Sequence, residues 1–125
     1  SARALVEGSD VVVPVPLHPR RLRERGYNQA SLLARELGRR TARPCGEGAL
    51  VRRKDTTPQY GLSAAARRRN VAGAFAVRRR GLVAGRIVTL VDDVFTTGAT
   101  AYACARALKE AGAREVRLLS LARVL

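Results

Sequence analysis

Two neighbouring carboxylates stand out in a sequence whose charge is otherwise strongly positive. Asp92 and Asp93 close the apolar run 87–91 and come shortly before the segment TTGAT at residues 96–100. The three hydroxyl groups and the glycine of this segment precede a predicted helix, whose free backbone amides favour a phosphate. Carboxylates beside a phosphate would repel it unless they serve another part of the ligand. The vicinal hydroxyls of a sugar meet this need, so the pattern predicts a sugar phosphate, with phosphate on the loop and ribose on the acids.

Two other interpretations of the acid pair remain open at this point. One acid can cap the following turn while the other is solvated, or the pair can form an acidic magnesium pocket at the end of a strand. Successive strand residues point to opposite faces, so Asp92 and Asp93 share one ligand only if the strand has already turned there. We therefore expect a turn at the acids as part of the site.

The net charge indicates an anionic partner. The chain has 24 Lys+Arg against 10 Asp+Glu, a net charge of +14, and all of the basic residues except Lys54 and Lys109 are arginines. A guanidinium offers a planar pair of donors that matches phosphate oxygens. An arginine-rich genome is the alternative explanation of this bias. Three arginine groups, at 20–25, 67–69 and 78–80, are expected in loops or at the edges of elements.

The order of predicted elements is that of a single α/β domain spanning residues 1–125. Residues 87–91 are expected to form the central parallel strand, because they are apolar and β-branched. Asn28 is the expected N-cap of a helix over 29–40, with an apolar stripe at Leu32, Leu33 and Leu37. The other expected elements are strands at 11–16, 49–52, 74–78 and 116–121, a long loop at 54–70, and a helix at 99–111 that ends at Gly112.

The two cysteines and the hydropathy suggest a cytoplasmic protein. Cys45 and Cys104 lack CxxC spacing and a nearby histidine, so neither a disulfide framework nor a zinc site is indicated. No stretch approaches the ~20 apolar residues of a membrane span, and no leader pattern opens the chain. We expect no membrane insertion.

Three segments carry a resemblance to a known family. Residues 88–100 resemble the phosphoribosyl pyrophosphate (PRPP) motif of type I phosphoribosyltransferases. With VPVPLHPRRLRERGYNQA and TPQYGLSAAARRRNVAGAF, the chain is identified as a member of the ComF family of competence-associated, amidophosphoribosyltransferase-like proteins. The resemblance implies a type I phosphoribosyltransferase fold, a Rossmann-like parallel sheet flanked by helices with a long flexible loop. ComF-like proteins commonly begin with a cysteine-rich zinc module, which this sequence lacks, so we expect no zinc.

The resemblance also implies a role for each part of the site. Asp92 and Asp93 would hold the ribose hydroxyls. The 5-phosphate would be bound by Thr96, Thr97, Gly98, Ala99 and Thr100. The pyrophosphate loop would contribute Leu17, His18, Arg20, Arg21 and Arg25, with loop packing as the alternative role of His18. The flexible loop that closes over the substrate would contain Gln59, Arg67 and Asn70. Phe95 and Tyr60 are candidates to stack an acceptor base, or they pack structurally, and Tyr27 is either a core residue or a base platform.

Two hypotheses about function follow from the resemblance and the charge. In the first, the chain binds PRPP with Mg²⁺, serves DNA uptake together with competence proteins, and transfers phosphoribose to an unidentified acceptor as a type I phosphoribosyltransferase. In the second, it is a non-catalytic single-stranded DNA-binding protein that uses the fold as a scaffold. Single strands are held by basic grooves with aromatic platforms, and aromatic residues make up only 4% of this chain, which weakens base stacking.

Overall fold

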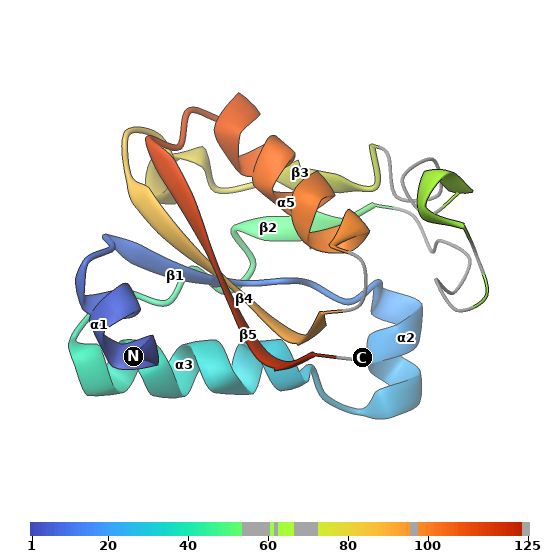
Figure 1. Cartoon of the computed structure of the whole chain (residues 1–125), viewed down its shortest axis with the longest axis horizontal. Coiled ribbons are helices and arrows are strands. Elements are labelled where there is room, and N and C mark those ends of the chain that lie inside the picture. Colours follow the sequence, from blue (N-terminus) through green and yellow to red (C-terminus); the bar gives the residue numbers. More distant parts are fainter. Residues whose placement is uncertain (54–60, 62, 67–72, 96–97, 124–125) are drawn as a thin grey trace.

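The computed structural model describes residues 1–53, 61, 63–66, 73–95 and 98–123, except for the side chains of 93–95 and 121–123. Helices and strands are mixed along this part of the chain, with two helices and then two strands between β1 and η1 (Figure 1). The elements are α1 Ala2–Glu7, β1 Val11–Pro14, α2 Pro19–Arg25, α3 Gln29–Thr41, β2 Leu50–Arg52, β3 Phe75–Val77, the 3-10 helix η1 Arg80–Leu82, β4 Ile87–Phe95, α5 Ala99–Glu110 and β5 Glu115–Arg123.

A parallel sheet forms the centre of the fold. Its strand order is β1-β4-β5, so β4 pairs on both sides, as the sequence predicted for residues 87–91. The short strands β2 and β3 form a separate antiparallel pair. Helix α5 and the β2–β3 pair lie on one side of the sheet, and α1 and α3 lie on the other (Figure 1). The carboxyl ends of β1 and β4 therefore point toward the same edge of the molecule.

Both faces of the central strands are buried, which explains their continuous apolar sequence. Val11 and Val13 of β1 pack in the larger core with residues of α5 and β2, whereas Val12 packs in the smaller core with Ala34 of α3. On β4, Val88 and Leu90 face the larger core, and Val91 faces the smaller one. This alternation fixes which residues after Val91 point toward α5.

Helix α3 begins where the sequence predicted. The Asn28 Oδ1 accepts a hydrogen bond from the Ala30 N–H at 3.1 Å, and the helix runs to Thr41, one residue beyond the predicted end. The predicted apolar stripe is wrong in one position, because Leu32 is 46% exposed while the small residues Ala30 and Ala34 are buried. None of the helices in the described ranges is long and apolar enough to cross a membrane.

Three local predictions are corrected. Residues 17–25 were expected to form a loop, but most of them belong to α2, and α1 was not expected at all. Strand β4 continues through the acids to Phe95, four residues beyond the predicted end. Helix α5 ends at Glu110, with Ala111 rather than Gly112 as its C-cap. The other strands lie within three residues of their predicted bounds.

Candidate active site

The ends of β1 and β4 bring two predicted parts of the site together. Pro14 is paired with Val91, and the Val15 N–H donates to the Val91 carbonyl at 2.8 Å. Asp92 is the next residue of β4, and the chain leaves β1 at the same level toward α2. The Asn28 Nδ2 donates to the Val15 carbonyl at 3.1 Å, which fastens the start of α3 to this point. Asp92 and the predicted pyrophosphate segment therefore share one end of the sheet.

Asp92 lies on the side of β4 that faces α5. The residue is half-buried and lies on the same side of the strand as Val88 and Leu90. Burial raises the pKa of the Cys104 thiol of α5 well above its usual range, and the negative charge of Asp92 raises it further. This carboxylate is thus within electrostatic reach of the helix that follows the strand.

The turn that we expected at Asp92 and Asp93 is not found, because the backbone stays in strand β4 to Phe95. Asp92 pairs with Ser120, and the ladder continues from Val94 with Ala122 to Phe95 with Arg123. The prediction failed because β5 extends beside β4 and supplies backbone partners after the apolar run has ended. The side chains of Asp93 and Phe95 lie outside the described part of the structure, so their predicted roles stay predictions.

Gly98 determines how the chain enters α5. Its φ of +85° is the left-handed conformation that glycine adopts without steric cost, and it occupies the N-cap position of the helix. A glycine cap carries no side-chain acceptor for the first-turn amides, which suits a helix end that binds an anion. Ala99 is buried and Thr100 half-buried. Thr96 and Thr97 lie outside the described residues.

Helix α2 carries the arginines that were predicted to bind pyrophosphate. His18 is the N-cap of this helix, and its Nδ1 accepts a hydrogen bond from the Arg20 N–H at 3.1 Å. The Arg20 guanidinium also pairs with Glu24 at 3.6 Å, and the Arg25 guanidinium lies 5.8 Å from the centre of the Tyr27 ring. No residue of α2 is buried, so the helix displays its charges at the sheet end. The described geometry gives His18 a capping role.

Most of the predicted flexible loop is outside the described structure: of residues 54–70, only 61 and 63–66 are described, and 64–66 form a short helical turn. Gln59, Tyr60, Arg67 and Asn70 all belong to ranges that are not described, and their roles stay predictions.

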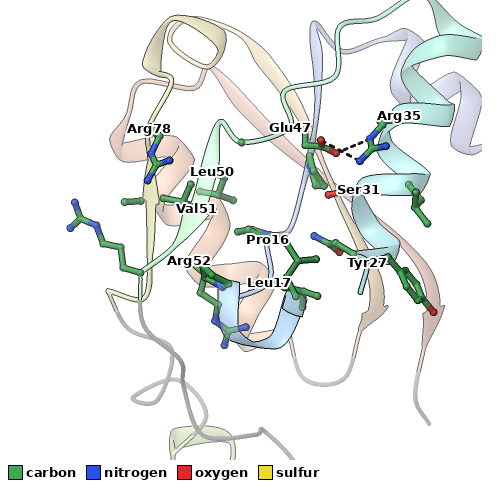
Figure 2. A pocket seen from close by; sticks show the side chains of 18 of the residues that line it. Pro16, Leu17, Tyr27, Ser31, Arg35, Glu47, Leu50, Val51, Arg52 and Arg78 are labelled. Carbon is green, nitrogen blue, oxygen red and sulfur yellow. Dashed lines mark hydrogen bonds and ion pairs between the residues drawn. The ribbon is translucent and has the colours of Figure 1, made fainter. Parts of the chain in front are cut away.

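A groove that the sequence did not predict lies on the side of β1 away from β4. Its volume is about 810 Å³. The walls come from the segment after β1, from α3 and from the β2–β3 pair (Figure 2). The lining includes Pro16, Leu17, Tyr27, Arg35, Glu47, Leu50, Val51, Arg52 and Arg78, and no described residue of β4 or α5. Tyr27 is 48% exposed here, which rules out the core position that the sequence left open.

An ion pair joins two walls of the groove. The Arg35 Nε and Nη2 donate to the two carboxylate oxygens of Glu47 at 2.8 Å and 3.3 Å (Figure 2). The hydrogen bond and the charge of Glu47 raise the pKa of Arg35 above its usual value. Sequence patterns did not reveal this pair, because Arg35 lies on the polar side of an amphipathic helix and Glu47 in the connection to β2. The pair holds α3 against the segment that leads into the β2–β3 pair.

Comparison with known proteins agrees with this architecture. Residues 22–124 match the family described as the phosphoribosyl transferase domain, and the chain belongs to that family. It is 40% identical over 115 residues to Competence protein F of Haemophilus influenzae, which covers 91% of this chain and 50% of that protein. It is also 40% identical over 116 residues to the DNA utilization protein YhgH of Escherichia coli K12, covering 93% of this chain and 50% of the relative. The predicted resemblance to the ComF family is confirmed by these relatives, and the chain spans half of their length.

A solved structure supports the predicted fold class. The glutamine phosphoribosylpyrophosphate (PRPP) amidotransferase from B. subtilis, complexed with ADP and GMP, aligns with a TM-score of 0.61 and 25% identity. The alignment covers 96% of this chain and 25% of the amidotransferase. The type I phosphoribosyltransferase fold expected from the sequence is therefore confirmed.

Proposed function

We propose that this chain binds PRPP at the end of β4 and serves the handling of DNA that enters the cell. The observation that supports PRPP binding is the position of Asp92, in the carboxyl half of the central strand, just beyond the end of β1 and ahead of the Gly98-capped helix α5. In open α/β sheets, ligands bind outside the carboxyl ends of the strands. Membership in the phosphoribosyl transferase domain family supports the same site.

Each part of the proposed site acts on a different part of PRPP. Asp92 accepts hydrogen bonds from the ribose hydroxyls, and Asp93, the next strand residue, joins it only if the end of β4 turns when PRPP binds. The 96–100 segment binds the 5-phosphate with backbone amides and hydroxyls. Each charge-assisted hydrogen bond contributes about 1.5–3 kcal/mol. The basic residues of α2 attract the pyrophosphate. The ribose therefore lies at the acids, between two anionic ends that the 96–100 segment and α2 hold.

The donor set also fits magnesium bound together with PRPP. Carboxylate oxygens are ligands that Mg²⁺ accepts, and Mg²⁺ is usually held by one or two carboxylates together with phosphate oxygens. When bound, the ion would supply charge neutralisation of the pyrophosphate. Asp92 is the residue that would face it, joined by Asp93 only if the strand turns there. In a transferase, C1 of the ribose would lose pyrophosphate and form a bond to the acceptor through a carbocation-like transition state, with α2 stabilising the leaving group.

The names of the relatives support the role in DNA handling. One is a competence protein and another a DNA utilization protein. The net charge of +14 favours a second candidate function, the direct binding of single-stranded DNA without catalysis. Phosphate attraction of this kind depends on basic surface and not on the acids.

Thermal shift measurements with PRPP and Mg²⁺ test the first function. The double variant Asp92→Asn, Asp93→Asn should lose the stabilisation that wild type gains, because a ligand stabilises only the state it binds. Glu7→Gln with Glu110→Gln is the matched control, since both acids are exposed and each pairs with one arginine, at 3.3 Å and 3.4 Å. A PRPP-dependent shift that survives in the Asp92 and Asp93 variant would contradict the assignment.

Salt titrations with labelled single-stranded DNA test the second candidate function and distinguish it from PRPP binding. The same acid variant should bind DNA as tightly as wild type or slightly more tightly, because two negative charges are removed. If the folded acid variant loses DNA binding, the two ligands share the β4 site. If wild type shows no salt-dependent binding, the second candidate function is rejected.

A further inference from the structure

Most of the exposed large apolar side chains in the described chain gather in one place. Five large hydrophobic residues of the described chain are exposed, and Leu22, Tyr27 and Leu32, exposed by 41%, 48% and 46%, all line the groove beside β1. Single exposed apolar residues are common on soluble proteins, but a contiguous cluster marks an interaction site. The cluster continues into the groove through Pro16, Leu17 and Leu50.

The charges around this groove are almost all positive. Arg35, Arg52, Arg53 and Arg78 line it, and Glu47 is the only acidic residue among the lining residues in the described chain. In Figure 2, Arg78 and Arg52 lie on the side of the β2–β3 pair, with Leu50 and Val51 between them, and Arg35 lies on the other side of the groove. Glu47 is already held by Arg35. An acidic partner would therefore meet guanidinium groups on more than one side of an aliphatic floor.

We propose that the groove docks an acidic segment of a partner protein that presents apolar side chains on one face. The floor consists of proline, leucine and valine side chains, which match the side chains of a peptide. Single-stranded nucleic acid is instead held on aromatic platforms, and Tyr27 is the only aromatic residue that lines the groove in the described structure. Arginine beside apolar anchors is typical of protein interfaces. This proposal does not rest on PRPP binding.

Fluorescence anisotropy with synthetic peptides tests the proposal. The probe is a labelled helical peptide with leucine on one face and glutamate on the other, compared with peptides in which lysine replaces glutamate or serine replaces leucine. Only the acidic amphipathic peptide should bind. Leu22→Ser with Leu32→Ser should weaken this binding by about tenfold or more, because both leucines would be buried on docking. Both residues are already exposed, so the variant is expected to fold.

Matched variants separate the groove from general attraction to a basic protein. Tyr102→Ser with Leu118→Ser removes the two exposed apolar residues that do not line the groove and should leave peptide binding unchanged. Arg78→Glu should weaken binding more than Arg80→Glu, since both arginines are exposed but only Arg78 lines the groove. Equal effects in either pair, or no binding of the acidic peptide, would overturn the proposal. So would competition by an oligothymidylate that is sensitive to Leu22→Ser, because the groove would then accept nucleic acid.

Discussion

Replacement of Thr89 by valine should stabilise the protein, although Thr89 lies in the middle of the central strand. The residue is 0% exposed, and within the described part of the chain no group forms a hydrogen bond with its Oγ1. A buried hydroxyl without a partner costs about 1–3 kcal/mol. Valine has the same branched shape and a high preference for strands. We therefore expect the free energy of unfolding to rise by about 1–2 kcal/mol.

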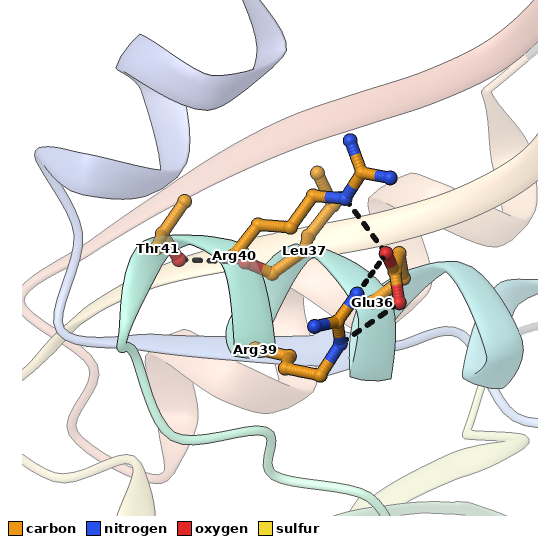
Figure 3. A network of polar contacts seen from close by, with 5 residues as sticks. All are labelled: Glu36, Leu37, Arg39, Arg40 and Thr41. Atoms are coloured by element: carbon orange, nitrogen blue, oxygen red, sulfur yellow. Dashed lines mark hydrogen bonds and ion pairs between the residues drawn. The ribbon is translucent and has the colours of Figure 1, made fainter.

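Urea denaturation followed by circular dichroism measures this change. With a urea m-value of about 2 kcal/mol/M, the midpoint should rise by roughly 0.5–1 M while the m-value stays constant. Thr41→Val is the matched control, because the Thr41 Oγ1 donates to the Leu37 carbonyl at 2.7 Å (Figure 3). This second change should lower the free energy of unfolding by about 0.5–1.5 kcal/mol. The reasoning is refuted if both substitutions change stability in the same direction, or if Thr89→Val lowers it.

Three further predictions concern caps, surface charge and thiols. Asn28→Ala should lower the free energy of unfolding by about 1.5–3 kcal/mol, because it removes both the N-cap of α3 and the hydrogen bond to Val15. His18→Ala should lower it by only about 0.5 kcal/mol, because α2 has no buried residue. Equal losses in urea denaturation would contradict this prediction. The Arg39 and Arg40 hydrogen bonds lower the pKa of Glu36 from 4.5 to about 2 (Figure 3), so its contribution to stability is present above pH 4.5 and lost as the pH falls toward 2. The small difference in urea midpoint between wild type and Glu36→Gln at low salt should therefore vanish over that range, and a difference that persists at pH 2 would rule out the charge as its cause. Burial raises the pKa of both thiols, more strongly for Cys104 than for half-buried Cys45. Iodoacetamide at neutral pH should therefore modify Cys45 first in the native protein. The reverse order, measured by mass spectrometry, would show that Cys104 is accessible.

Features governed by local chemistry were predictable from the sequence. An asparagine before an amphipathic segment fixed the start of α3, because the cap bonds to an amide two residues away. The apolar run at 87–91 identified the central strand, since both of its faces are covered. The position of Asp92 in the carboxyl half of β4, beyond the end of β1, followed from the α/β order of the elements.

Helix α2 escaped prediction because hydrophobic periodicity reports burial, and this helix buries no residue. Local interactions hold it instead: a proline at its start, the His18 cap and the Arg20 pair with Glu24. The extension of β4 through the acids was missed for a different reason. Backbone pairing with β5 maintains the strand after its apolar side chains end, and no side-chain pattern records such pairing.

The groove was unpredictable for a third reason. Its walls come from α3, β2 and β3, which are far apart in sequence, so only the fold places Arg35 opposite Arg78. The arginine group at 78–80 was noticed as a cluster of charge, but the sequence did not indicate that Arg78 alone would face an aliphatic surface.

The pairing of β1 with β4 has a consequence for how the chain acquires its structure. The Ile87 N–H donates to the Asp10 Oδ2 at 2.7 Å across a separation of 77 residues, and Val11 pairs with Val88 directly beside it. Closing a loop of that length costs about 4 kcal/mol of chain entropy before any strand contact compensates for it. Chains rich in such distant pairings fold slowly, on the scale of milliseconds to seconds. During synthesis, β1 would leave the ribosome long before its partner and expose a run of valines, so this edge is where a chaperone would be expected to bind the nascent protein.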